Sequence, residues 1–185
     1  MFIKTVDVQH GRLSVTSERG KTYHVDINTK AITQSDSRSS SPLPISDVPD
    51  SVKRALTNGS AGKKYELSFR IKPFYLEGDF NGDGNMDTAV LVREGSTGKF
   101  GIGIVHGTTG KVTILGAGIA IGNGGDDFEW MDSWQVYSKM HAAHAPGDTS
   151  ISRLGGDALL VEKSEAASGL IYWNGKKYVW SQRGD

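Results

Sequence analysis

Residues 79–87 read Asp-Phe-Asn-Gly-Asp-Gly-Asn-Met-Asp and place an oxygen-bearing side chain at every second position. The candidate ligands are Asp79, Asn81, Asp83, Asn85 and Asp87. Three carboxylates this close repel one another unless a cation lies between them. Calcium is a hard cation that takes about six to eight oxygen ligands, and a short loop with this spacing can wrap it. The spacing therefore predicts a Ca²⁺ site.

The flanking residues indicate the kind of loop. Apolar residues precede the loop at 74–76 and follow it at 89–92, which favours a strand on each side. An EF-hand needs flanking helices and a bidentate Glu at the twelfth loop position, and that position is Val90. A turn without metal is the alternative, because Asp, Asn and Gly are common turn residues.

Residues 77–91, from Glu77 to Leu91, resemble the FG-GAP/VCBS-type calcium repeat of integrin-like β-propellers. The resemblance implies Ca²⁺ bound by Asp79, Asn81, Asp83 and Asp87, with the backbone carbonyl of Asn85 in the ligand ring. The chain has a single copy of the motif, and Thr88 stands where the family has an apolar residue. The rest of the chain resembles bacterial proteins that carry one such loop, which implies no particular activity.

A second segment, residues 122–137, combines acids with aromatic rings. It could be a strand whose aromatic side chains enter the core and whose acidic side chains lie on the solvent-exposed face. It could also be a recognition surface, because Trp anchors interfaces and sugar sites. The segment could also hold a second cation, or supply a pair of carboxylates for hydrolysis. The candidate surface consists of Asp126, Asp127, Trp130, Asp132 and Trp134.

The composition excludes several classes of protein. The chain has 185 residues, with 21 basic and 21 acidic side chains and a net charge of zero. This balance of charge does not indicate nucleic acid or an anionic membrane as a partner. There are no cysteines, so disulfides and thiolate zinc sites are excluded. No apolar run is long enough to predict a membrane span.

The cellular location is predicted from the calcium loop. Calcium modules of modest affinity fill where the ion is near millimolar, outside the cytosol. Residues 1–4 lead straight into a strand pattern and lack the regions of a secretion signal. We therefore expect a periplasmic or extracellular protein whose signal is absent from this chain, with a cytoplasmic location as the alternative.

The pattern of short alternating segments and 24 glycines predicts a mainly β protein with antiparallel meanders and one short helix. We expect a β-meander at 1–34, a Ser/Pro-rich linker or crossing segment at 35–49, and a main β domain at 50–185. The helix is predicted at 51–57, where it would cover a sheet face or edge, and one strand at 63–72. Residues 88–115 predict a three-stranded meander, and Asn174-Gly175 predicts a two-residue hairpin turn. A partial propeller-like or sandwich-like domain is expected, and not a full propeller.

These features together predict a non-enzymatic, calcium-stabilised β domain that binds another protein or a surface glycan. An inhibitor or immunity-type protein would fit this description. One alternative is a hydrolase that uses the acidic cluster 126–132. Another is a module of a larger adhesin. No catalytic residue is assigned.

Overall fold

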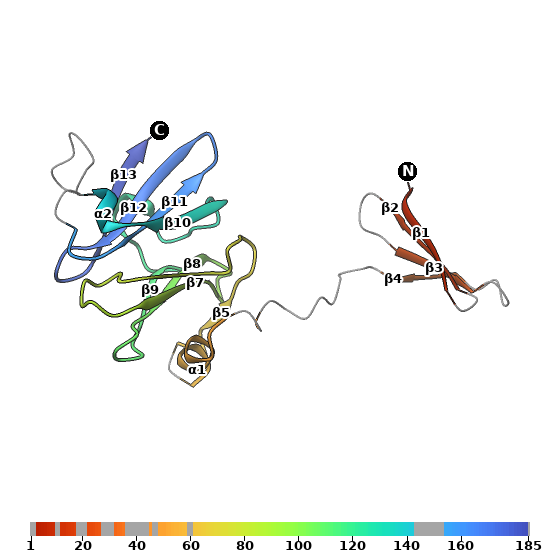
Figure 1. Cartoon of the computed structure of the whole chain (residues 1–185), viewed down its shortest axis with the longest axis horizontal. Coiled ribbons are helices and arrows are strands. Elements are labelled where there is room, and N and C mark those ends of the chain that lie inside the picture. The colour runs from red at the N-terminus through yellow and green to blue at the C-terminus, as the bar shows by residue number, and fades with distance from the viewer. Residues whose placement is uncertain are drawn as a thin grey trace. The chain divides into compact units, whose positions relative to one another are not determined.

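The computed structural model describes residues 3–9, 12–17, 22–26, 32–35, 45, 48–58, 61–142 and 154–184 (Figure 1). The chain divides into two compact units, residues 1–43 and residues 44–185. The first unit is an antiparallel sheet of β1 (Ile3–Gln9), β2 (Arg12–Ser17), β3 (Thr22–Asp26) and β4 (Ile32–Ser35), paired in chain order. Most of the predicted linker at 35–49 lies outside the described residues, so the predicted boundaries stay predictions.

The second unit contains two antiparallel sheets. The first sheet consists of β5 (Tyr65–Leu67), β6 (Tyr75–Gly78), β7 (Asp87–Glu94), β8 (Phe100–Val105) and β9 (Val112–Gly116). Strand β7 is central, because β5 and β6 pair with different parts of it while β8 pairs along its length. The predicted three-stranded meander over residues 88–115 is confirmed as β7, β8 and β9.

The second sheet consists of β10 (Ser133–Tyr137), β11 (Ala158–Lys163), β12 (Ala167–Trp173) and β13 (Tyr178–Gly184), paired in chain order. Helix α1 (Asp50–Asn58) lies near the predicted position, and α2 (Lys139–Ala142) and η2 (Gly122–Gly124) are single turns. The mainly antiparallel β fold class with one short helix is therefore confirmed. No sheet closes into a barrel in the described part of the chain, so the fold is not a full propeller.

The main core lies between the two sheets of the second unit. The inner face of β7 contributes Ala89 and Leu91, which share one buried cluster with Trp134 of β10 and Ile171 of β12. Alternate residues of a strand point to opposite faces of the sheet. Val90 and Val92 therefore face the other way, where they pack with buried apolar residues of α1. The layers are helix, sheet and sheet, and the prediction that the helix covers a sheet face is confirmed (Figure 1).

The strand predicted at 63–72 is shorter than its alternation suggests. Strand β5 ends at Leu67, and the chain then bends toward the second sheet. Phe69 packs on the helix side of the first sheet, whereas Ile71 is buried between the sheets. The guanidinium of Arg70 donates to the backbone carbonyls of Phe128 and Met131. These contacts hold the bend, so the even spacing of apolar residues here does not mark one face of one strand.

The hairpin between β12 and β13 differs from the predicted turn in register. An Asn174-Gly175 two-residue turn would pair Trp173 with Lys176, but Trp173 pairs with Tyr178. The side-chain oxygen of Asn174 accepts hydrogen bonds from the amides of Lys176 and Lys177. Asn174 therefore closes the hairpin from the first position of the turn, because its side chain replaces a backbone acceptor.

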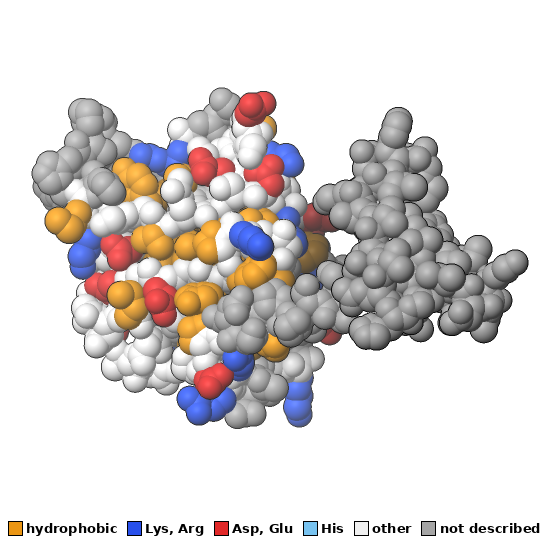
Figure 2. Space-filling model, turned by 45° about the vertical axis from the view of Figure 1, so that its right-hand side comes forward, with side chains coloured by type: hydrophobic (Ala, Val, Ile, Leu, Met, Phe, Trp, Pro, Cys, Tyr) orange, Lys and Arg blue, Asp and Glu red, His pale blue; other side chains and the backbone are white. Residues whose placement is uncertain are grey.

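The surface carries no single-signed patch on the face drawn in Figure 2. Acidic and basic side chains are interspersed there among apolar ones. This arrangement agrees with the zero net charge of the chain.

Glu94, the last residue of β7, is an acid that is only 4% exposed. Its carboxylate accepts hydrogen bonds from the hydroxyl of Ser96 and from both the amide and the hydroxyl of Thr97. The hydrogen bonds from Thr97 and Ser96 stabilise the charged form and lower the pKa of Glu94 from 4.5 to about 2. The carboxylate thereby fixes the turn that joins β7 to β8.

We expect Glu94→Gln to destabilise the domain at neutral pH and to lose this effect in acid. A carboxyl whose pKa is lowered by folding stabilises the fold above its unfolded pKa, and this contribution disappears as pH falls through the folded pKa. The wild type and the variant should therefore converge between about pH 4.5 and pH 2. Urea unfolding across this pH range measures the difference in stability. Glu66→Gln, at the exposed position of β5, is the control. A difference that persists at pH 2 would contradict the assignment.

Candidate metal centre

The loop with the predicted calcium ligands joins β6 to β7 in the first sheet. Gly78 and Asp87 are the last pair of this hairpin, so the loop begins and ends at the same point of the sheet. The aromatic ring of Phe80 is 1% exposed and packs between the sheets, which anchors the loop at its second position. Gly82 has a φ of 77°, a left-handed conformation that favours glycine where the loop turns back.

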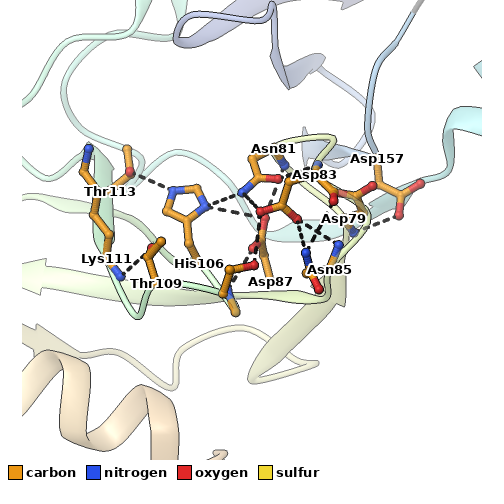
Figure 3. Close-up of polar contacts among 12 residues, drawn as sticks. Asp79, Asn81, Asp83, Asn85, Asp87, His106, Thr109, Lys111, Thr113 and Asp157 are labelled. Carbon is orange, nitrogen blue, oxygen red and sulfur yellow. Dashed lines mark hydrogen bonds and ion pairs between the residues drawn. The ribbon is translucent and has the colours of Figure 1, made fainter.

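The loop is curled by hydrogen bonds from its own amides to its own side chains. Asn81 Oδ1 accepts from the amide of Asp83 at 2.8 Å, and Asp83 Oδ1 accepts from the amide of Asn85 at 2.8 Å. Asp79 Oδ2 accepts from the amide of Gly84 at 3.2 Å. The amide of Asn85 lowers the pKa of the exposed Asp83 carboxyl. The sequence-predicted ligands therefore lie in one compact turn, shown in Figure 3.

Asp87 is the ligand candidate at the end of the loop, and it is fully buried. Its Oδ1 accepts from the amide of Gly107 at 3.0 Å, and its Oδ2 accepts from the amide of Asn81 at 3.2 Å. Burial raises the pKa of Asp87 above its ordinary value, and the hydrogen bonds from the amides of Gly107 and Asn81 oppose this rise. A charged Asp87 thus needs more positive charge than its present neighbours supply.

His106 is a neighbour that the sequence did not identify. Asn81 Oδ1 accepts a backbone hydrogen bond, so the Asn81 Nδ2 group faces His106 Nδ1 at 3.0 Å. Because Nδ2 can only donate, His106 Nδ1 accepts and its proton lies on Nε2, which is 3.1 Å from Thr113 Oγ1. His106 Nδ1 also lies 3.6 Å from Asp87 Oδ2. The neutral ring therefore supports the loop from the residue that follows β8 (Figure 3).

Two residues beside the second sheet contact the loop: Asp157, which lies just before β11, and Lys139, the first residue of α2. The amide of Asp79 donates to Asp157 Oδ2 at 3.1 Å, and the carbonyl of Asp79 accepts from the amide of Asp157 at 2.7 Å. Lys139 Nζ lies 3.1 Å from Asp79 Oδ2, and the Lys139 amide donates to Asp157 Oδ1. The first residue of the loop, which follows β6, is therefore held by segments that adjoin the second sheet.

Backbone also meets backbone directly where the loop lies on residues 155–157. A side chain at Gly156 would collide with the carbonyl of Asp79 and with the amide of Gly82. A Cβ at the neighbouring Gly155 would have nothing within 4 Å. The close approach thus depends on one glycine of the pair, and it brings the loop against the start of β11.

Two buried polar atoms near the loop lack a partner. Among the described residues, only Asp79 Oδ1 and the Tyr178 hydroxyl are buried side-chain oxygens or nitrogens without a hydrogen bond. Burial raises the pKa of Tyr178, and the charges of Asp87, Asp79 and Asp83 raise it further. The ring of Tyr178 stacks on that of His106, with 6.2 Å between the ring centroids. A buried carboxylate oxygen without a partner is costly, so Asp79 Oδ1 marks a place where a cation or a donor would stabilise the loop.

The donor set fits a cation that prefers oxygen. It contains three carboxylates and two side-chain amides, and it contains no thiolate. No group of three or more His, Cys, Asp or Glu side chains is arranged to hold a metal within the described ranges. The carboxylates alone therefore form no ready cage, and the amide and backbone oxygens that the resemblance implies would have to complete it.

The second predicted segment is divided by the fold between core and surface. Trp134 is 2% exposed, and its Nε1 donates to the carbonyl of Pro73 at 2.9 Å, so its ring belongs to the core. Asp132 accepts from the amide and hydroxyl of Ser164 and pairs with Lys163. The remaining three candidates, Asp126, Asp127 and Trp130, line one cavity of about 370 Å³.

Sequence reasoning missed four residues of the loop surroundings: His106, Lys139, Asp157 and Tyr178. All four lie far from residues 79–87 in the chain and reach them only through the fold. One local signal was present, because Gly155-Gly156-Asp157 combines small residues with a carboxylate just before a strand. Small residues there permit a close backbone approach.

We expect Gly156→Ala to separate the loop from the second sheet. The added Cβ would press on backbone atoms of Asp79 and Gly82, so the free energy of unfolding should fall by about 1–3 kcal/mol. Gly155→Ala is the matched control, because its Cβ points into open space, and should change stability by less than ~0.5 kcal/mol. Equilibrium urea unfolding measures both. Equal effects of the two substitutions would refute the close approach.

Comparisons with models of protein families, with curated proteins and with solved structures return no match to this chain. Over the part of the chain that the structure describes, no helix is both long enough and apolar enough to cross a membrane. What the loop and the cavity bind is therefore inferred from their own contacts.

Proposed function

We propose that residues 79–87 bind a calcium ion whose role is to fix the loop between β6 and β7 and, through Asp79, its contacts with Asp157 just before β11. The observation that carries this proposal is the buried Asp79 Oδ1, which has no hydrogen-bond partner although Asp157 and Lys139 both hold Asp79. A cation beside this oxygen would give it a partner. It would also offset the repulsion between Asp79 and the buried Asp87.

The ion would be held by the side chains of Asp79, Asn81, Asp83 and Asp87, together with the backbone carbonyl of Asn85. This is the ligand set implied by the resemblance to the FG-GAP/VCBS-type repeat. An oxygen-only set in a glycine-containing loop suits Ca²⁺ better than Zn²⁺, which prefers nitrogen and sulfur. When bound, the ion supplies positive charge, and its binding free energy adds to the stability of the fold.

The role proposed for the whole domain is recognition, without catalysis. Asp126 is paired with Lys99, and Asp127 Oδ1 accepts from the amides of Phe100 and Glu129. These contacts fix both carboxylates in place, which favours a binding surface over a pair of acids that exchange protons. The partner would be another protein or a surface glycan, as for an inhibitor, an immunity-type protein or an adhesin module. A hydrolase that uses residues 126–132 is the alternative.

The place of action proposed with this function is the periplasm or the cell exterior. Calcium modules with dissociation constants of about 10⁻⁴–10⁻³ M are filled outside the cytosol. A loop that lacks a bidentate Glu and has exposed Asp83 and Asn85 is suited to this modest affinity.

Thermal unfolding in Ca²⁺ and in EGTA tests the calcium proposal. At a calcium concentration about 100 times the dissociation constant, the fold gains about 2.7 kcal/mol, so the Tm should rise by roughly 5–10 °C. Asp79→Asn, which keeps the side-chain shape, should lose most of this shift. The matched control is Glu77→Gln, which removes a negative charge from an exposed side chain two positions before Asp79 and should keep it.

Two outcomes would refute the calcium proposal. One is a wild-type Tm that is the same in Ca²⁺ and in EGTA. The other is an Asp79→Asn variant that keeps the full shift. A parallel scan in Mg²⁺ separates a specific ion from general screening, and an equal shift in Mg²⁺ would count against Ca²⁺.

A further inference from the structure

A cavity of about 370 Å³ lies between the η2 turn and the last two strands of the second sheet. Its size is at the lower end of the range for small-molecule sites, about 300–1,000 Å³. It is lined by two indole rings, two carboxylates and small polar groups. The lining side chains used below are Asp126, Asp127, Trp130, Ser168, Trp180 and Gln182.

The aromatic part of this cavity is rigidly supported. The ring of Trp180 lies directly on Gly124 and Gly169, because a Cβ at either position would overlap it. Trp180 Nε1 donates to Gln182 Oε1 at 3.2 Å. The rings of Trp130 and Trp180 are 6.0 Å apart at an angle of 84°, so they form a right-angled corner. This corner exists before any ligand arrives.

The charge of the lining is negative. Asp126 is paired with Lys99, and Asp127 is held by two backbone amides at Oδ1. Asp127 Oδ2 accepts no hydrogen bond from any residue that the structure describes. The lining contains no Lys or Arg. Lys99 and Arg70 interact electrostatically with Asp127 from outside the lining. Two carboxylates thus share the lining with two aromatic rings whose faces carry negative potential.

We infer that this cavity binds an organic cation, an alkylammonium or guanidinium group. Aromatic faces attract such cations, and the carboxylates of Asp126 and Asp127 in the lining favour a cation over a neutral sugar. The inference rests on the proposed recognition role of this surface and names its ligand class. It requires no calcium, because the loop at 79–87 contributes no residue to the cavity.

Isothermal titration with choline tests the inference, with dimethylbutanol as the neutral analogue in which carbon replaces the charged nitrogen. Choline should bind and dimethylbutanol should bind at least about tenfold more weakly. Methyl hexopyranosides serve as the glycan probe. Failure of choline to bind, equal binding of the neutral analogue, or tighter binding of the sugars would overturn the inference.

Variants locate the binding site. Trp130→Leu and Asp127→Asn should each weaken choline binding by roughly tenfold. The matched control is Trp173→Phe, which changes a half-buried ring on the same sheet that does not line this cavity. Thermal unfolding confirms that each variant is folded, and Asp127→Glu provides a milder second variant that should retain choline binding. Unchanged affinity in both Trp130→Leu and Asp127→Asn would overturn the assignment.

Two further arms identify the source of the cation. Phosphatidylcholine vesicles present a lipid headgroup, and acetyl-arginine amide and acetyl-trimethyllysine amide present protein side chains. The probe that binds the wild type and binds Trp130→Leu more weakly identifies the source of the cation. If neither kind of probe binds, the inference is overturned. All titrations are run in Ca²⁺ and in EGTA. Choline binding without a calcium-induced Tm shift would refute the calcium proposal alone, and a Tm shift without choline binding would refute this inference alone.

Discussion

A carboxylate that is removed from water must find donors or a cation, and this constraint shapes the junction between the two sheets. Asp87 is fully buried there, and it takes one amide from the loop and one from the turn after β8. Asp79 is held through Asp157, which lies just before β11. The loop, the turn and the segment before β11 are thus arranged around negative charge, and one carboxylate oxygen, Asp79 Oδ1, is still without a partner.

Local chemistry made part of this structure predictable. Short apolar runs separated by turn residues over 88–115 identified three strands, because most side chains of the first two are buried. The two-residue spacing of oxygens over 79–87 identified a tight turn between strands, and the chain forms one. In both cases the information lies within a few neighbouring residues. The mainly antiparallel β fold followed from such segments.

The rest depends on contacts between distant parts of the chain. Strand β5 stops at Leu67 because Arg70 reaches the carbonyls of Phe128 and Met131, which no local pattern reveals. Trp134 and Trp130 look alike in the sequence, yet one is buried in the core and the other lines a cavity that Trp180 completes. The surroundings of the loop at His106, Asp157 and Tyr178 could not be assigned for the same reason.

The paired hydrogen bonds between Asp79 and Asp157 join residues that are 78 positions apart. Contacts of such sequence separation require a long loop to close and therefore form late in folding. The hairpin of β6 and β7 can assemble early from neighbouring residues, but its first aspartate is set in position only when β11 has docked. The loop would consequently acquire its full affinity for an ion at the end of folding, as a property of the assembled sandwich that an excised peptide of the same sequence would lack.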